Sequence, residues 1–501
     1  KEELRKIDQE LSKLGPEFGD NVLKATNTFK MILESESELE GLPPSAVQAY
    51  AEAAKEAGLD GKWLVTLHGP SFIPFMTYAS KRRHRETLWR AYGARAIDEN
   101  QELTKRIVTL RHKRAQLLGY ETHAHFTLEE RMAGNPKTVM TFLEDLLEKV
   151  APAARRDISE VKAHKKSVTG SDEFAPWDYA YWSEKLKVAQ HDFNEEELRP
   201  YFKLENVIDG VFEHARRLYG LSFKTRTDIP TYHQDVRTYE VVEEKTGRHI
   251  GLFYADFFPR ASKRGGAWMT TFRDQGYVTE GGGQVLRPHV AIVCNFTKPT
   301  STAPSLLTLD EVKTLFHEFG HALHGLLSEC KYISLAGTHV YWDFVELPSQ
   351  IMENWVGERE ALSLFAKHYQ TGAVIPESLT AKIKDSAQFQ AGYFALRQLN
   401  FGLLDMSWHT ADPSTVTDVI AFERAATAKS SLFAPVDGTN QSTAFTHIFA
   451  GGYSAGYYSY KWAEVLDADA FEFFKEKGLF DPEVARQFRD CVLSRGGTEA
   501  P

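Results

Sequence analysis

The spacing of apolar residues predicts a chain that is mainly helical. From Lys1 to about Leu221, apolar positions recur every three or four residues, and proline or glycine interrupts them, as in Gly134-Asn-Pro136. The same spacing returns after Leu309 and continues through segments such as 379–406. We therefore expect helices over both stretches.

Between these stretches the spacing changes to the pattern of short strands. Apolar and β-branched residues concentrate in four runs between turn signals, which include Thr246-Gly247 and the glycines at 281–283. The four predicted strands cover residues 239–243, 250–256, 267–272 and 290–295. A small sheet should therefore precede the helix that starts near Leu309.

Length and composition are those of an ordinary globular protein with two or more domains. The chain has 501 residues, of which 42% are hydrophobic and 26% are charged. We place the domain boundary between a helical lobe at 1–225 and a second region at 226–501. The chain opens inside a helical pattern without methionine, so we expect that it lacks an N-terminal helical portion and a C-terminal tail of a longer protein.

Charge and cysteine content narrow the range of partners. The net charge of −10 disfavours nucleic acid and anionic membranes, which need a basic surface. No apolar run approaches the roughly 20 residues of a membrane span. Three cysteines without framework spacing fit a reducing compartment. We expect a cytoplasmic monomer.

Two histidines four positions apart carry the clearest chemical signal, in His317-Glu-Phe-Gly-His321. On a helix, residues i and i+4 share a face, so both imidazoles can bind one zinc ion with Glu318 at the rim as a general base. Zinc lowers the pKa of bound water, which can then attack a polarised carbonyl. The motif indicates peptide-bond hydrolysis. The competing interpretation is a pair of core histidines bonded to backbone, with Glu318 in a salt bridge.

The segment that follows offers the third metal ligand. Catalytic zinc usually takes three protein ligands, so another donor is needed. Glu346 lies 25 residues after His321, and Glu353 lies two helical turns further on. Asp343 could accept the second ring hydrogen of a zinc-bound histidine. Either glutamate could instead be a solvated helix charge.

These motifs resemble the thimet oligopeptidase family of zinc metallopeptidases, and within it the bacterial peptidyl-dipeptidases and oligopeptidase A. The resemblance rests on ordered motifs along nearly the whole chain. They are His317-Glu-Phe-Gly-His321-Ala-Leu-His324, Gly337-Thr-His339, Asp343-Phe-Val-Glu346-Leu-Pro-Ser-Gln350, Phe253-Tyr-Ala-Asp256, Lys263-Arg-Gly-Gly-Ala-Trp268, Cys294-Asn-Phe296 and His447-Ile-Phe-Ala-Gly-Gly-Tyr453-Ser-Ala-Gly-Tyr457-Tyr-Ser-Tyr460.

The resemblance implies both a fold and a set of roles. The fold would be a mainly α, two-lobed zinc peptidase with a small sheet beside the zinc helix and a deep cleft that admits short peptides. One zinc ion would be held by His317, His321 and Glu346, with Glu318 as general base. Tyr453 and Tyr460 would stabilise the transition state or the bound peptide, and His447 would face the substrate.

The resemblance favours one function and leaves two alternatives open. The favoured function is release of C-terminal dipeptides, which needs a group that grips the free carboxylate. The second is internal cleavage by an oligopeptidase, and the third is peptide binding without catalysis. The intact set of His317, Glu318, His321 and Glu346 disfavours the third.

Overall fold

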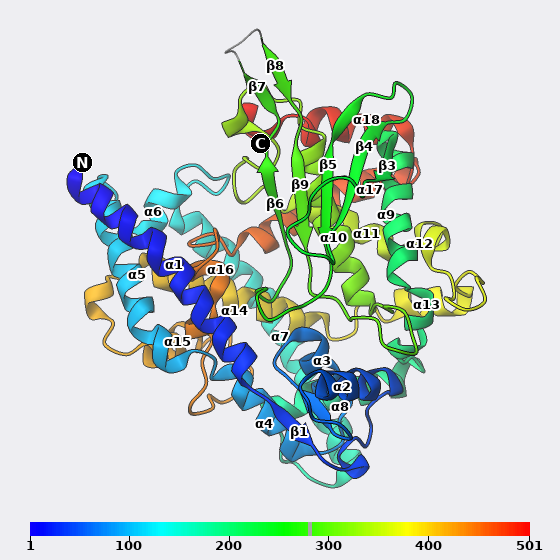
Figure 1. Cartoon of the computed structure of the whole chain (residues 1–501). Helices are drawn as coiled ribbons and strands as arrows, with labels where there is room; N and C mark the ends of the chain where they lie inside the picture. Colours follow the sequence, from blue (N-terminus) through cyan, green and yellow to red (C-terminus); the bar gives the residue numbers. More distant parts are fainter. Residues whose placement is uncertain (279–282) are drawn as a thin grey trace. The chain divides into compact units, whose positions relative to one another are not determined.

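Helices dominate the structure, a computed structural model that describes residues 1–278 and 283–501 (Figure 1). The predicted mainly α class is confirmed. Among the described helices, none combines the length and apolar character that crossing a membrane requires.

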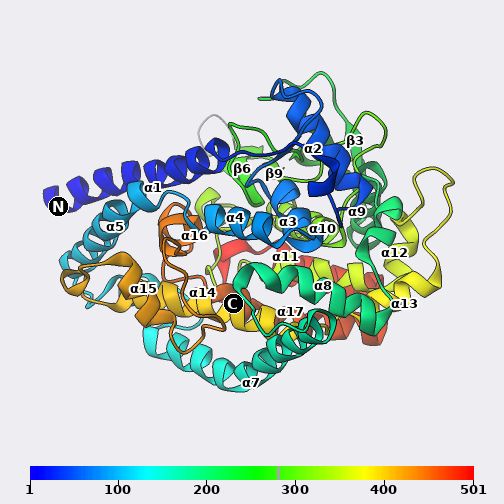
Figure 2. The same cartoon turned by 90° about the horizontal axis from the view of Figure 1, so that it is seen from below.

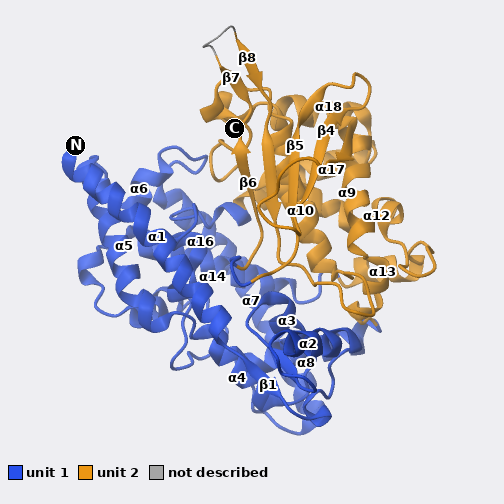
Figure 3. Ribbon diagram, in the orientation of Figure 1, with its two compact units in different colours: residues 1–192, 261–264, 387–461 blue, residues 193–260, 265–386, 462–501 orange. Residues whose placement is uncertain are grey.

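The chain divides into two compact units, each made of several chain segments (Figure 3). Unit 1 contains Lys1–Asp192, Ala261–Arg264 and Ala387–Lys461, and unit 2 contains Phe193–Arg260, Gly265–Ser386 and Trp462–Pro501. This division differs from a single boundary near residue 225, because the chain returns to unit 1 after residue 386.

Close helix packing explains that return. In unit 1, α14 (Ala391–Thr410) lies alongside α7 (Pro136–Thr169), as both views show (Figures 1 and 2). A β-carbon on Gly392 would lie 2.6 Å from the backbone nitrogen of Ala154, and one on Gly402 would lie 3.2 Å from Leu143. Gly392 and Gly402 therefore let α14, which comes late in the chain, pack against α7 in the N-terminal part of the chain. The spacing of apolar residues alone does not reveal this contact.

Unit 1 is almost entirely helical. Its other helices are α1 (Glu2–Thr28), α2 (Pro44–Glu56), α3 (Gly69–Tyr78), α4 (Arg82–Gly93), α5 (Ile97–Leu117), α6 (His123–Leu128), α8 (Pro176–His191), α15 (Val419–Thr427) and α16 (Thr446–Phe449). A two-stranded sheet pairs β1 (Met31–Leu33) with β2 (Trp63–Val65). The chain leaves unit 1 for the last time within α17 (Ser459–Lys477), whose first residues belong to unit 1 and whose remainder belongs to unit 2.

Unit 2 contains a five-stranded sheet in the order β3-β4-β5-β9-β6. Its strands are β3 (Leu221–Thr225), β4 (Arg237–Glu243), β5 (His249–Asp256), β6 (Trp268–Arg273) and β9 (His289–Val293). Neighbours are antiparallel except β5 and β9, which run parallel with Phe253 opposite Val290. The four predicted strands are confirmed within a few residues, whereas β3 was not predicted.

A hairpin and several helices complete unit 2. The hairpin pairs β7 (Gly276–Val278) with β8 (Gln284–Leu286), and the turn predicted at 281–283 lies partly outside the described residues. The helices are α9 (Leu204–Tyr219), α10 (Leu309–Leu326), α11 (Leu347–Asn354), α12 (Arg359–Phe365), α13 (Glu377–Asp385) and α18 (Pro482–Phe488).

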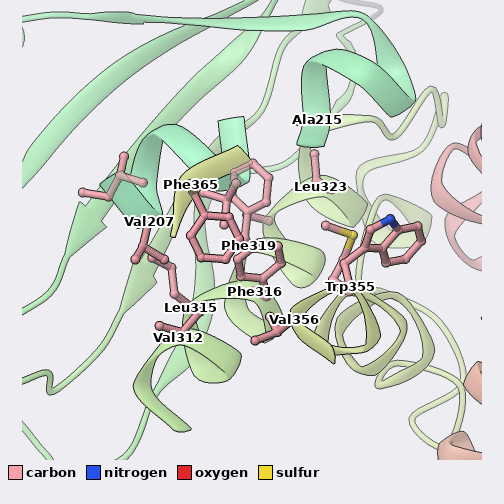
Figure 4. Packing of buried hydrophobic residues seen from close by; sticks show 14 of the residues in the cluster. Val207, Ala215, Val312, Leu315, Phe316, Phe319, Leu323, Trp355, Val356 and Phe365 are labelled. Atoms are coloured by element: carbon pink, nitrogen blue, oxygen red, sulfur yellow. The ribbon is translucent and has the colours of Figure 1, made fainter. Parts of the chain in front are cut away.

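The core of unit 2 surrounds α10. One face of this helix is apolar, and its side chains pack among residues of α9, α12 and the segment after α11 (Figure 4). Phe316 and Phe319 are both fully buried. On the sheet side, a β-carbon on Gly325 would lie 3.0 Å from Val290 of β9, so α10 approaches the sheet closely. The packing fixes α10 on both sides and leaves a third face for chemistry.

Candidate active site

The helix that carries the two histidines begins at a complete capping box. The Thr308 hydroxyl accepts the Glu311 backbone N–H at 3.1 Å, and the Glu311 carboxylate accepts the Thr308 N–H at 2.9 Å. Two of the backbone donors at the helix start are satisfied in this way. Glu311 also accepts the Thr297 N–H at 2.6 Å, which ties the helix start to the preceding loop. The predicted start of the helix is confirmed.

His317 and His321 lie one turn apart on α10, with ring centroids separated by 5.0 Å. Their helix is held by the apolar residues that point into the core, so the two imidazoles need little additional ordering. His321 is buried and His317 is mostly buried. The arrangement is the i, i+4 pair that the sequence predicted.

Glu346 lies directly before α11 and meets both histidines. One carboxylate oxygen, Oε2, lies 3.2 Å from Nε2 of His317 and 3.2 Å from Nε2 of His321. The Ser349 hydroxyl donates to the same oxygen at 2.9 Å and to the Glu346 carbonyl at 2.8 Å. The Glu346 side chain is fully buried. Two residues of α10 and the residue that precedes α11 thus converge on one point.

The three side chains fit a zinc ion. Their candidate ligand atoms all lie within 4.8 Å of one another. Ligand atoms of a tetrahedral zinc site, at about 2.0 to 2.2 Å from the metal, lie roughly 3.3 to 3.6 Å apart. The two 3.2 Å separations are close to that spacing. Two imidazoles and one carboxylate are a common donor set for catalytic zinc.

Opposite charges reinforce the group. Burial lowers the pKa of His317, but hydrogen bonds to Glu346 and Glu353 outweigh it and hold this pKa well above its usual range. Burial would raise the pKa of Glu346, but the nearby His321 and His317 outweigh it and hold this pKa well below its usual range. Without a metal, the pair is therefore held as an imidazolium beside a carboxylate, and a metal ion would replace that proton when it binds.

The other ring nitrogen of His317 has its own partner. Nδ1 lies 2.7 Å from Oε1 of Glu353, near the end of α11. A carboxylate there fixes the ring orientation and leaves Nε2 directed at Glu346. The sequence offered Glu353 as a possible ligand, and the structure places it behind His317 instead. Asp343 is fully buried ahead of Glu346, and its predicted contact with a histidine stays a prediction.

Glu318 is buried next to the metal group. Its side chain sits among the charges of His317, His321 and Glu346, and burial raises its pKa. Within residues 1–278 and 283–501, no hydrogen-bond donor reaches its Oε2 atom. A buried carboxylate oxygen without a donor is costly, and water or a substrate group would satisfy it. The role of Glu318 as general base stays a prediction.

The three residues predicted to face the substrate gather in unit 1. The rings of Tyr453 and Tyr460 are stacked, with centroids 5.2 Å apart and an interplanar angle of 14°. The His447 ring lies 5.9 Å from that of Tyr453 and 6.4 Å from that of Tyr460. The structure therefore brings these three together, and their contact with a substrate stays a prediction.

Comparison with known proteins assigns the class. The family model described as Peptidase family M3 matches residues 75–501, and the chain belongs to this family. It is a metallopeptidase, a hydrolase of peptide bonds, and the family is zinc-dependent in general. The resemblance on which the sequence prediction rested is confirmed.

Several individual proteins are similar along the whole chain. Oligopeptidase A of Escherichia coli strain K12 is 42% identical over 99% of this chain and 74% of its own length. Dipeptidyl carboxypeptidase of the same strain is 36% identical over 100% of this chain and 73% of its own. The structure of PZ peptidase A with an inhibitor has a similar fold, with a TM-score of 0.58 at 14% identity, over 99% of this chain and 71% of that one.

Proposed function

We propose that this chain hydrolyses short peptides with a zinc ion held by His317, His321 and Glu346. The supporting observation is the convergence of three ligand atoms within 4.8 Å beside a buried glutamate whose Oε2 has no donor among the described residues. Other buried polar atoms of the described residues also lack a partner, His214 Nε2 among them. What sets Glu318 Oε2 apart is its place among the charges of His317, His321 and Glu346, where water or a substrate group would satisfy it.

The roles of the protein side chains follow from their positions. Zinc, when bound, would supply Lewis-acid polarisation of the scissile carbonyl and promote deprotonation of water. Glu318 accepts a proton from the attacking water and later donates it to the leaving nitrogen. Glu353 holds His317 in the tautomer and orientation that direct Nε2 to the metal. Ser349 holds the carboxylate of Glu346.

We assign Tyr453 and Tyr460 to the substrate. A phenol donates one hydrogen bond without carrying charge, so it stabilises a developing oxyanion more than a neutral amide. Both rings are partly exposed and held parallel, and the exposed His447 lies beside them. Three donors in one cluster suit a peptide, which presents a carbonyl at every residue.

The position of the cut has two candidates. The sequence motifs favour release of C-terminal dipeptides, which also suits the 36% identical dipeptidyl carboxypeptidase. The 42% identity to oligopeptidase A favours cleavage within short peptides. The two candidates share the metal and Glu318 and differ only in whether a free C-terminal carboxylate is required.

Cleavage of an internally quenched peptide by zinc-loaded protein tests the shared part. We expect cleavage that a chelator stops and added zinc restores. Glu318→Gln should bind zinc with unchanged stoichiometry while kcat falls by roughly 10²- to 10⁴-fold. The matched control is Glu360→Gln, which changes an exposed glutamate of α12 and should keep full activity. Comparable turnover by Glu318→Gln would exclude it as the base.

A single peptide in two forms tests the position of the cut. The peptide is supplied with a free C-terminal carboxylate and with a C-terminal amide, and the products are identified by mass spectrometry. Successive dipeptides from the free acid alone indicate dipeptide release. The same internal cut in both forms indicates an oligopeptidase. Bound zinc without any cleavage would favour a peptide-binding protein.

A further inference from the structure

The turn between Tyr453 and Tyr460 has an unusual backbone. Ala455 has φ of +52°, a left-handed conformation that is unfavourable for a non-glycine residue. Ala455 is fully buried, and the Tyr453 N–H donates to the carbonyl of His447 at 3.1 Å. Such a conformation persists only where the surroundings hold it in place.

Asp405 of α14 fixes this backbone conformation by accepting hydrogen bonds from the turn. Its Oδ1 accepts the N–H of Ala455 at 2.8 Å, and its Oδ2 accepts the N–H groups of Gly456 at 2.8 Å and Tyr457 at 2.9 Å. The Asp405 side chain is fully buried. Three successive backbone donors on one carboxylate fix the path of the chain through the turn.

His409, one helical turn after Asp405, completes its set of donors. Nδ1 of His409 lies 2.8 Å from Oδ1 of Asp405, and Nε2 lies 2.9 Å from Nη1 of Arg111. A guanidinium only donates, so Nε2 is the acceptor and the ring proton is on Nδ1, directed at Asp405. Burial lowers the pKa of Arg111 to about 10, so it stays charged at neutral pH.

Arg111 also contacts the start of the segment 447–460, which carries His447, Tyr453 and Tyr460. The same Nη1 donates to the carbonyl of Ile448 at 2.7 Å, in the short helix that carries His447. A second contact links α6, where Nε2 of His123 lies 3.0 Å from the Ser454 hydroxyl. The Asp405–His409–Arg111 group and the separate His123 contact thus both hold the segment that carries His447, Tyr453 and Tyr460.

We propose that Asp405, oriented by His409 and Arg111, is a positioning residue that sets the place of Tyr453 and Tyr460. The inference rests on the proposed role of these tyrosines at the substrate. A rigid turn matters because a misplacement of about 1 Å in such a group can cost on the order of 10²-fold in rate. Asp405 itself touches no substrate in this account.

The variant Asp405→Asn changes the network with the smallest change in size. The amide replaces one acceptor oxygen with a donor, which would face a backbone N–H or the His409 N–H. At least one buried donor then loses its acceptor, and the turn should relax. The matched control is Asp178→Asn, a fully buried aspartate of the same unit that pairs with Arg82 and Arg85 and contacts no part of the turn.

The two variants should separate positioning from stability. We expect Asp405→Asn to lower kcat by on the order of 10- to 100-fold with a smaller change in KM and unchanged zinc content. Asp178→Asn should keep kcat within about twofold, even where its thermal unfolding midpoint falls. Hydrogen exchange of the amides at 455–457 should accelerate in Asp405→Asn alone. Wild-type kcat in folded Asp405→Asn overturns the proposal.

Combination with tyrosine variants gives a readout that a general structural role would not change. If Asp405 acts through the tyrosines, its loss in kcat should largely disappear in the background of Tyr453→Phe and Tyr460→Phe. If the factors by which the separate variants lower kcat simply multiply in the combined variant, the proposal is overturned. If the two phenylalanine variants themselves keep full kcat, the proposed tyrosine role fails and this inference fails with it. If they lose kcat and Asp405→Asn does not, only the inference fails.

A second pair of variants covers the case in which Asp405→Asn does not fold. His409→Asn can still donate from its amide toward Asp405, whereas His409→Leu cannot. We expect His409→Asn to retain at least several-fold more kcat than His409→Leu at equal zinc content. Equal activity of the two folded proteins would overturn the role of the His409 hydrogen bond.

Discussion

Gly320 of α10 and Pro348 of α11 lie so close that a β-carbon on Gly320 would lie 2.2 Å from the Pro348 carbonyl oxygen. The same atom would lie 2.7 Å from the Cα of Ser349. Both neighbours are backbone, so no side-chain rotation relieves the contact. Because Glu346 directly precedes α11, this approach is what brings its carboxylate to the two histidines.

Gly320→Ala should therefore impair the metal site without changing any ligand. The added methyl group forces α10 and α11 apart, at a cost of about 1 to 3 kcal/mol in the free energy of unfolding. We expect zinc affinity, measured by competition with a chromophoric chelator, to fall by roughly tenfold or more. Gly357→Ala is the control, because a β-carbon there meets nothing within 4 Å. Wild-type zinc affinity in Gly320→Ala would contradict this account.

Glu353→Gln tests the partner of His317. The neutral amide weakens the hydrogen bond to Nδ1, so the ring is less well oriented and less basic. Zinc affinity should fall by about 10- to 100-fold, the usual effect of removing such a partner. Activity at saturating zinc should fall less than affinity. If the affinity of Glu353→Gln matches that of Glu360→Gln, the contact at 2.7 Å has no role in metal binding.

The sequence predicted the metal group and its helix because their signals are local. The capping box at Thr308, the apolar face and the i, i+4 histidines all lie within one helix. Their physical meaning depends on helix geometry alone. The third ligand needed the resemblance, because nothing local distinguishes Glu346 from Glu353.

Other features depend on contacts between distant segments and were not predictable from spacing. Gly320 is recognisable as essential only once α11 is placed against it. Asp405 and His409 form a visible i, i+4 pair, yet their bond to the turn at 455–457 joins positions fifty residues apart. The assignment of residues 387–461 to unit 1 likewise follows from packing against α7.

Zinc removal should lower stability as well as activity. A ligand that binds only the folded state raises the free energy of unfolding, by about 4 kcal/mol at 1,000 times its Kd. We expect the thermal unfolding midpoint to rise when zinc is added to chelator-treated protein. His317→Ala should lose that rise. An unchanged midpoint in the wild-type protein, at zinc concentrations that restore cleavage, would argue against a preformed site in unit 2.

Acid should destabilise unit 2 through His214, a buried histidine of α9. Its Nδ1 donates to the Gly210 carbonyl at 2.7 Å, and within the described part of the chain Nε2 meets no hydrogen-bond partner. The rings of Phe316, Phe365 and Phe480 surround it at 5.1 to 6.1 Å. Burial lowers the pKa of His214 to about 4, so the folded protein holds it neutral.

The direction of the pH effect follows from that lowered pKa. The unfolded chain binds a proton at His214 below about pH 6.5, whereas the folded chain binds it only near pH 4. The free energy of unfolding is therefore highest above about pH 6.5, and it falls as the pH is lowered from 6.5 to 4. The loss amounts to about 3 kcal/mol. His214→Gln cannot titrate, so the difference in free energy of unfolding between wild type and variant should shrink from pH 7 to pH 5. Denaturant unfolding of zinc-free protein measures this difference. Every other titrating group is shared by the two proteins, so curves of unfolding free energy against pH that run parallel would refute the effect assigned to His214.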